Sequence, residues 1–316
     1  MNISPKHIIL GAGGAISNAL AKELKLNNEN IKLVSRSGKS FENIPSVKTD
    51  LTKPQEVLDV VEYSSVVYLL AGIQYKTSAW QEQWPKIMQN TIDACKAKNA
   101  GLIFFDNVYP YGKVDGVMNE ETPINPCSKK GEIRAKLDEN LLNEIKFKNL
   151  NGIIARAADF YGPYSENTSI PLILVFKNLL NGKKAQWLVN SKTKHSFTFT
   201  GDCGKALYLL AKNDSAFNQV WHMPTANPAL TGEEFVSLVA QGLNVKSGTT
   251  ILKKWMIKLI GIFNWQIKEL YEMLYQNEFD YVFDSSKFEK QFNFKPTSYS
   301  DGITETIKYL EKTQST

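Results

Sequence analysis

Residues 10–17 read Leu-Gly-Ala-Gly-Gly-Ala-Ile-Ser, a glycine-rich turn directly after the apolar segment His7–Leu10. A helical pattern begins at Ala15 and continues to Leu26, so the turn joins a predicted strand to a predicted helix. Glycine lets the backbone approach a pyrophosphate, and the first N–H groups of a helix attract its negative charge. A second strand-like segment, Ile31–Val34, follows about 20 residues on, as in dinucleotide-binding units. This stretch therefore predicts a dinucleotide site on a Rossmann-type fold.

Short apolar segments alternate with helical patterns over about the first 160 residues. The segments are rich in β-branched or aromatic residues, which is typical of parallel strands covered on both faces. The alternation predicts an α/β fold with a doubly wound parallel sheet and right-handed crossovers. The predicted strands are His7–Leu10, Ile31–Val34, Val66–Ala71, Leu102–Phe105 and Ile153–Ala155, and the predicted helices are Ala15–Leu26, Pro54–Glu62, Gln81–Lys98 and Lys130–Lys146.

The chain changes character from Ser169, where helices mix with short strand-like pieces. We therefore predict a dinucleotide-binding domain at residues 1–168 and a smaller α/β substrate lobe at 169–316, with part of the sheet packing shared. The lobe's predicted helices are Ile170–Leu180, Asp202–Ala211, Thr231–Ala240 and Leu270–Gln276, and its predicted strands are Gln186–Val189 and Gln219–His222.

One segment of the lobe, Ile251–Trp265, has two interpretations. It combines Trp, Phe and Ile with lysines, as an interfacial membrane helix does. Gly261 and Lys258 interrupt its apolar run, so a buried helix pair is the preferred interpretation.

Composition excludes several classes of protein. The 316 residues include 37 basic and 32 acidic side chains, a formal charge of +5, with ordinary globular usage. Lysines alternate with glutamates rather than forming a basic stripe, so we expect no nucleic-acid partner. The best uncharged apolar run, Ile170–Phe176, is too short to cross a membrane, and three cysteines without CxxC spacing indicate neither a disulfide framework nor a metal site. We expect a soluble cytoplasmic protein without a membrane partner. Whether the chain forms a homodimer is left open.

The end of the second predicted strand indicates which dinucleotide binds. NAD-binding proteins place an acid there to accept the ribose 2′-hydroxyl. Here Ser35, Arg36 and Ser37 follow Val34, and the guanidinium and hydroxyls can hold a 2′-phosphate. The sequence therefore predicts NADP(H) over NAD(H), with an ordinary exposed loop arginine as the alternative. The triplet Gly38-Lys39-Ser40 lacks the earlier glycine of a nucleoside triphosphate loop.

Further motifs follow the glycine turn in a characteristic order. They are Asp50-Leu51, Leu70-Ala71-Gly72, Asn107-Val108-Tyr109, Arg156–Pro163, His195–Asp202 and Trp221–Pro224. With them the chain resembles the extended short-chain dehydrogenase/reductases, and more narrowly the NAD-dependent epimerase/dehydratase family, over nearly its whole length. The resemblance implies adenine beside Asp50, the central phosphates and ribose beside Ala71, and the nicotinamide near Arg156 to Ala158. The expected cofactor residues are Gly11, Gly13, Gly14, Ala15, Ile16, Ser35, Arg36, Ser37, Asp50, Leu51, Ala71, Gly72, Arg134, Ala157 and Ala158.

The chain departs from this family at its catalytic pair. The family's Tyr-x-x-x-Lys motif aligns with Lys130 and Arg134, and the strand end at Asp106 lacks the usual hydroxyl. Lys130 and Arg134 share one helix face, and a neighbouring guanidinium disfavours a charged lysine, so Lys130 could act as an acid/base group. Alternatively the two cations grip ribose or an anionic substrate, or lie on the surface. The candidate catalytic residues are Lys130, Tyr109 and Tyr161, and the candidate substrate residues are Tyr75, Asp106, Asp159 and His195.

Two functions are consistent with these features. The first is an NADP(H)-dependent oxidoreductase or epimerase acting on a small polar substrate, either sugar-like or a nucleotide sugar. The alternative is a catalytically altered dinucleotide-binding sensor or regulatory protein, which the exchanged pair at Lys130 and Arg134 favours.

Overall fold

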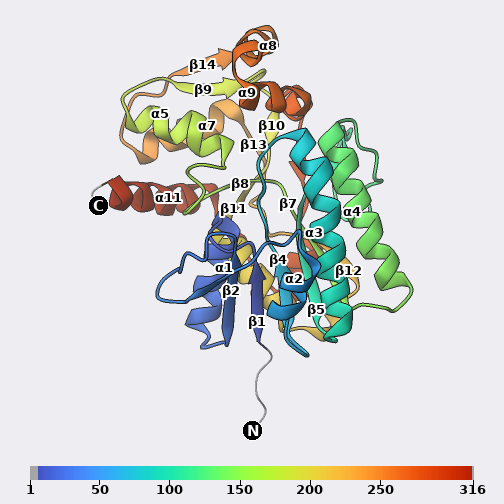
Figure 1. The fold of residues 1–316 in the computed structure, drawn as a ribbon. Helices are drawn as coiled ribbons and strands as arrows, with labels where there is room; N and C mark the ends of the chain where they lie inside the picture. Colours follow the sequence, from blue (N-terminus) through green and yellow to red (C-terminus); the bar gives the residue numbers. More distant parts are fainter. Residues whose placement is uncertain (1–5, 315–316) are drawn as a thin grey trace. The chain divides into compact units, whose positions relative to one another are not determined.

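Seven strands form the main sheet of the computed structural model, which describes residues 6–314 (Figure 1). In chain order they are β1 (His7–Leu10), β2 (Ile31–Ser35), β3 (Ser46–Lys48), β4 (Val66–Leu69), β5 (Gly101–Asn107), β7 (Gly152–Ala157) and β12 (Gln219–His222). Their order across the sheet is β12-β7-β5-β4-β1-β2-β3, and β1 to β5 pair in parallel. The chain moves outward from β1 to β3 and then returns to β4 beside β1, as in a doubly wound fold. The predicted Rossmann-type α/β fold class is confirmed.

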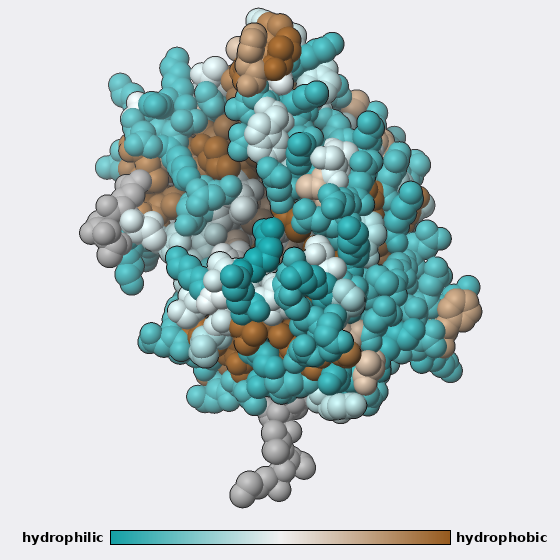
Figure 2. All heavy atoms as spheres, viewed as in Figure 1, coloured by the Kyte–Doolittle hydropathy of each residue, from teal (hydrophilic) through white to brown (hydrophobic). Residues whose placement is uncertain are grey.

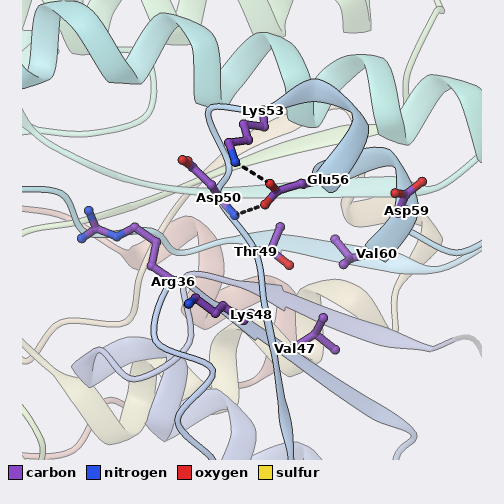
Figure 3. Close-up of a pocket in the computed structure, with 9 residues that line it drawn as sticks. All are labelled: Arg36, Val47, Lys48, Thr49, Asp50, Lys53, Glu56, Asp59 and Val60. Atoms are coloured by element: carbon purple, nitrogen blue, oxygen red, sulfur yellow. Dashed lines mark hydrogen bonds and ion pairs between the residues drawn. The ribbon is translucent and has the colours of Figure 1, made fainter.

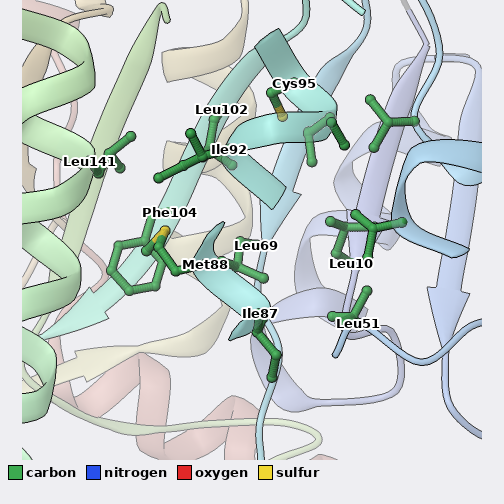
Figure 4. Packing of buried hydrophobic residues seen from close by; sticks show 14 of the residues in the cluster. Leu10, Leu51, Leu69, Ile87, Met88, Ile92, Cys95, Leu102, Phe104 and Leu141 are labelled. Carbon is green, nitrogen blue, oxygen red and sulfur yellow. The ribbon is translucent and has the colours of Figure 1, made fainter. Parts of the chain in front are cut away.

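Amphipathic helices pack against this sheet. They are α1 (Ala15–Leu26), α2 (Pro54–Val60), α3 (Thr77–Ala97), α4 (Lys129–Lys146) and α6 (Thr200–Ala211). Leu10 of β1 and Leu69 of β4 lie in one buried cluster with Met88 of α3 (Figure 4). Where α6 meets α1, a side chain on Gly204 would lie 2.6 Å from the backbone of Ala19. Glycine is therefore needed for that helix contact.

The rest of the chain contains short strand pairs and further helices. The parallel pairs are β6 (Val117–Met118) with β15 (Val282–Phe283), β8 (Asp159–Tyr161) with β11 (Phe197–Phe199), and β9 (Ala185–Leu188) with β14 (Thr249–Leu252), and β10 (Lys194–His195) pairs antiparallel with β13 (Leu230–Thr231). The helices are α5 (Lys177–Leu180), α7 (Gly232–Gly242), α8 (Lys254–Phe263), α9 (Trp265–Leu270), α10 (Ser286–Phe292) and α11 (Tyr299–Gln314). A 3₁₀ turn at Tyr109–Tyr111, a π-helical turn at Leu172–Phe176 and 3₁₀ turns at Asp214–Ala216 and Tyr271–Asn277 complete the elements. Seven of the seventeen buried residues in the main core of this part are aromatic.

The chain forms two compact units, each built from separate segments. The sheet unit contains the described residues up to Pro110, Lys130–Arg156 and Cys203–Trp221. The second unit contains Tyr111–Lys129, Ala157–Asp202 and the chain from His222 onward. These units differ from the predicted division at residue 168, because α6 and β12 return to the sheet unit. The predicted lobe strand Gln219–His222 is β12, at the edge of the main sheet. A short apolar segment does not show which sheet it will join.

The segment Ile251–Trp265 is not a buried helix pair. It forms the end of β14, all of α8 and the first residue of α9. Trp255 is 60% exposed and Phe263 is 93% exposed, so an apolar side of α8 faces solvent. Among residues 6–314, no helix combines the length and apolarity needed to cross a membrane.

Candidate active site

The glycine-rich turn lies where the strand order of the sheet reverses. Gly11 and Gly13 have φ values of +98° and +100°, which side chains rarely adopt. A Cβ on Gly11 would lie 2.3 Å from the Cα of Ala71, so the turn packs directly against the segment that follows β4. Ser17 occupies the third small position, where its hydroxyl accepts from the N–H of Gly14 at 2.9 Å. The structure therefore brings together the turn and the Ala71-Gly72 segment.

The backbone of this turn fits the pyrophosphate of a dinucleotide. A Cβ on Gly13 would meet nothing within 4 Å, and one on Gly14 only the hydroxyl of Ser17 at 3.8 Å. Ala15 and Ile16 begin α1, whose first N–H groups and positive helix end attract phosphate. An accessible backbone at a helix start is the arrangement that this ligand requires.

The loop after β2 is organised by a buried hydroxyl. The Oγ atom of Ser35 lies 3.0 Å from that of Ser46 and 3.5 Å from that of Ser37, and it accepts from the N–H of Gly38 at 3.1 Å. Ser35 therefore shapes the loop, whereas Arg36 and Ser37 are exposed. The predicted phosphate-holding role of Ser35 stays a prediction, and the structure adds that its hydroxyl shapes the loop.

A cavity of about 600 Å³ lies beside this loop (Figure 3). Its lining residues are Arg36, Val47, Lys48, Thr49, Asp50, Lys53, Glu56, Asp59 and Val60. Gly38, with φ of +67°, lies close to Lys48, since its Cβ would be 3.3 Å from the Cβ of Lys48. The cavity thus has two exposed cations, Arg36 and Lys48, on the side of the β2 and β3 ends.

Two acids of the cavity are held by neighbouring groups. Asp50 accepts from the backbone N–H and the hydroxyl of Thr52 at 3.0 and 2.7 Å, and these hydrogen bonds lower its pKa. Glu56 accepts from the N–H of Asp50 at 2.7 Å and from Lys53 at 2.8 Å. Leu51 is buried in the sheet core rather than in the cavity lining.

A buried network of two arginines and two aspartates lies between β5, α4 and β7. Arg134 donates from Nε to Asp106 at 2.5 Å and from a terminal nitrogen to the carbonyl of Phe105 at 3.1 Å. Arg156 donates to the other oxygen of Asp106 at 3.2 Å and also to Asp138. Burial, and secondarily the charge of Asp106, raise the pKa of Asp138. All four side chains are at most 5% exposed.

This network bears on two predicted roles. Arg134 does not present its guanidinium to a cofactor, because that group binds Asp106 and the strand backbone. Asp106 does not face a substrate, because both of its oxygens accept from arginines. Arg156 is 2% exposed and donates to Asp106 and Asp138, and its expected location near the nicotinamide stays a prediction. The exchanged residues at positions 106 and 134 compensate each other's charge.

Lys130 has a different environment from Arg134, although both are buried. Its ammonium donates to the hydroxyl of Thr77 at 3.0 Å and lies 4.7 Å from the ring centre of Tyr75. The hydroxyls of Tyr75 and Tyr109 are 3.2 Å apart, and the ring of Tyr109 stacks on Trp80. The structure therefore brings together Lys130 and Tyr109, both predicted to be catalytic, and Tyr75, predicted to contact the substrate.

Sequence reasoning missed Thr77, Asp138 and the pairing role of Arg156. Asp138 had a detectable signal, because it continues the spacing i, i+4, i+8 from Lys130 and Arg134 on α4. Three ionisable residues on a helix face that is otherwise buried indicate a charge network. Thr77 had no such signal, since it lies 53 residues from the lysine that it contacts.

The remaining candidates lie in the second unit. The Nε2 atom of His195 is 3.0 Å from Asp159, and the imidazole stacks on the rings of Phe197 and Tyr281. His195 is 3% exposed, whereas the side chain of Asp159 is 34% exposed. These two predicted substrate residues thus form one pair with an accessible carboxylate. Ala157, the last residue of β7, and Ala158 are buried and directly precede Asp159 in sequence.

Tyr161 is a core residue rather than a proton donor. It is fully buried, packs against Phe199, Phe235 and Tyr299, and burial raises its pKa well above the usual value. A Cβ on Gly302 would lie 2.3 Å from its hydroxyl oxygen. No substrate can reach a phenol packed in this way, so the predicted catalytic role of Tyr161 is wrong.

Comparison with known proteins identifies a matching family. Residues 7–222 match the model of the NAD dependent epimerase/dehydratase family. Solved structures with the same fold include dTDP-glucose 4,6-dehydratase from Bacillus anthracis in complex with NAD, at TM-score 0.80 and 17% identity over 99% of this chain and 98% of that one. UDP-glucose 4-epimerase from Thermus thermophilus in complex with NAD has TM-score 0.77 and 14% identity over 97% and 99%. UDP-N-acetylglucosamine 4-epimerase from Bacillus cereus has TM-score 0.78 and 16% identity over 98% and 97%. No curated protein matches significantly.

Proposed function

The chain belongs to the NAD-dependent epimerase/dehydratase family, and on that premise we propose that it is an NADP(H)-dependent oxidoreductase or epimerase of a sugar-like substrate. The family is one of enzymes that use a nicotinamide dinucleotide, as the resemblance of the motifs implied. The structural relatives act on nucleotide sugars by their names. We extend that substrate class, a nucleotide sugar or a related small polar molecule, to this chain.

The observation that carries the cofactor proposal is the pair of cations beside the cavity at the β2 and β3 ends. No acid follows β2, so the usual acceptor for a ribose 2′-hydroxyl is absent from that position. Arg36 and Lys48 are exposed there, and Asp50 and Glu56 are held by Thr52 and Lys53. A 2′-phosphate would meet two cations at this edge of the cavity. Gly11, Gly13, Gly14 and the start of α1 would hold the pyrophosphate.

The chemistry assigned to this chain's own residues is proton transfer by a tyrosine pair beside Lys130. The nicotinamide, when bound, supplies or accepts hydride. Tyr75 and Tyr109 are partly accessible, and their hydroxyl oxygens lie 3.2 Å apart. The Lys130 ammonium lies over the ring of Tyr75, and we assign proton release and recovery to the phenol pair beside it. Thr77 positions the ammonium.

Calorimetric titration of the full chain with NADPH and with NADH tests the cofactor preference. NADPH should bind more tightly, and Arg36→Ala should weaken NADPH binding by about 1.5–3 kcal/mol while changing NADH binding little. Lys39→Ala is the matched control, because Lys39 is an exposed cation of the same loop outside the cavity lining. Equal affinities, or equal losses from the two variants, would contradict the proposal.

One observation favours the second candidate function, a cofactor-binding sensor. The residue aligned with the family's ribose-holding lysine, Arg134, is committed to Asp106. A sensor would bind NADPH with the preference described above and show no turnover with any of a panel of nucleotide sugars. Turnover of one such sugar by the wild-type chain would exclude the sensor.

A further inference from the structure

An exposed apolar surface covers one side of α8 and the start of α9. Among the described residues, six of the sixteen large apolar side chains that are exposed lie within Trp255–Trp265. They are Trp255, Leu259, Ile260, Ile262, Phe263 and Trp265. Figure 2 shows apolar residues gathered at the top of the view, where Figure 1 places α8. Folded proteins rarely expose so many neighbouring apolar side chains unless the surface contacts a partner or a membrane.

The exposed side chains follow helical spacing. Trp255, Leu259, Ile262 and Phe263 occupy positions i, i+4, i+7 and i+8 of α8 and therefore form one stripe. We call these four residues the apolar stripe. Its members are 53% to 93% exposed. The exposed apolar residues therefore share one face of a regular helix and are not scattered over the surface.

The opposite side of α8 anchors the helix to its own unit. Ile257 is 2% exposed and lies in a small core with Leu188 and Leu274. A Cβ on Gly261 would lie 3.2 Å from the Cα of Lys268, so glycine lets α9 pack closely against α8. Asn264 accepts from two backbone N–H groups at the start of α9 and sets the turn. Gly261 therefore does not interrupt the exposed stripe, because it lies on the packed side.

The charged residues of α8 itself are all lysines, and the first acid after the helix is Glu269 of α9. Residues 235–268 contain five lysines and no aspartate or glutamate. Lys253, Lys258 and Lys268 are exposed around α8, and Lys254 pairs with Glu278. An apolar helix face with tryptophans, flanked by lysines, is the composition that binds the boundary between lipid headgroups and acyl chains. Anionic headgroups complement these lysines.

We propose that α8 is a membrane-docking helix. It places the apolar stripe at the boundary between the headgroups and the acyl chains of an anionic lipid bilayer, while the lysines contact the headgroups. A second copy of the chain fits this surface less well, because two such faces would bring their lysines together. The sequence predicted a buried helix pair in this segment and no membrane partner. The exposed stripe argues against both predictions. The attachment is peripheral, since α8 spans only Lys254–Phe263.

Vesicle flotation of the full chain tests this attachment. Vesicles of phosphatidylcholine with about 30% phosphatidylglycerol should carry the protein to the top of the gradient. Vesicles of phosphatidylcholine alone lack anionic headgroups and should carry much less of it. Phe263→Ser should weaken binding about tenfold or more. Lys253→Gln with Lys258→Gln should weaken it about 30-fold, from about fivefold per lysine.

Two matched controls separate the stripe from general surface effects. Phe147→Ser changes a phenylalanine that is 69% exposed in the sheet unit, and Lys22→Gln with Lys308→Gln removes two exposed lysines elsewhere. Both controls should leave flotation within about twofold of the wild type. The proposal is overturned if the wild type fails to float with anionic vesicles or if Phe263→Ser floats normally. It is also overturned if light scattering shows a dimer that Phe263→Ser dissociates, because a second copy would then cover the stripe.

Discussion

Replacing Arg134 by methionine tests the buried network between β5, α4 and β7. The variant leaves Asp106 with Arg156 as its remaining arginine, at 3.2 Å, and leaves the carbonyl of Phe105 without the guanidinium donor. Removing one partner of a buried ion pair costs about 3–5 kcal/mol, and the remaining arginine places this case near the lower end. Methionine keeps apolar contact with Trp84 and Phe104, whose ring centres lie 4.7 Å from the guanidinium carbon. We expect a loss of about 3 kcal/mol.

The free energy of unfolding can be measured by urea denaturation followed by circular dichroism. At about 2–4 °C per kcal/mol, the melting temperature should fall by roughly 6–12 °C. A double-mutant cycle with Asp106→Asn isolates the pair, and the coupling energy should be about 2 kcal/mol. Lys136→Met is the control, because Lys136 is an exposed residue of the same helix and should change stability by less than about 0.5 kcal/mol.

The measurement also distinguishes a structural Arg134 from one that holds the cofactor. A cofactor-holding arginine would lose NADPH affinity on substitution and leave the stability of the free protein nearly unchanged. The reasoning from the structure is refuted if Arg134→Met costs less than about 1 kcal/mol and the cycle with Asp106→Asn shows no coupling.

Three further predictions follow from single contacts. Gly11→Ala should lower the unfolding free energy by at least about 2 kcal/mol more than Gly13→Ala, because position 13 has nearly the same φ but no neighbour within 4 Å. Urea titrations of both variants test this. Similar losses would mean that the contact with Ala71 is unimportant. Lys130→Met should abolish turnover of whichever nucleotide sugar the wild type accepts while NADPH still binds, and full retention of kcat would exclude Lys130 from proton transfer. Burial lowers the pKa of His7 below its usual value of 6.5. The contribution of neutral His7 to the unfolding free energy should therefore be full above about pH 6.5 and decline as the pH falls through the folded pKa. His7→Gln should flatten that decline in melting temperatures measured between pH 7 and 5, and an unchanged slope would assign it to other groups.

Contiguous patterns were sufficient for the fold class and the position of the cofactor turn. The predicted strand His7–Leu10 and helix Ala15–Leu26 have the bounds found in the structure. Both are defined by side-chain spacing along neighbouring residues, and the backbone of the turn between them depends on glycine at positive φ. Local chemistry alone determines such elements, so they can be read without knowing the partners across the fold.

The roles of the charged candidates depended on residues far apart in the chain. Asp106 meets Arg134 and Arg156, which lie 28 and 50 residues away, and Lys130 meets Thr77 across 53 residues. A buried carboxylate must find a compensating charge, but many arrangements of the sequence satisfy that rule, and only the packing of β5, α4 and β7 selects one.

Exposure of α8 was decided in the same way. The sequence of Lys254–Phe263 determines an amphipathic helix with apolar residues on two sides, around Ile257 and around Phe263. In the folded protein the side of α8 that carries Ile257 packs into the core, and the side that carries Phe263 is exposed to solvent. Helical spacing shows which residues share a face, whereas burial of that face depends on the surface that the rest of the chain presents to it.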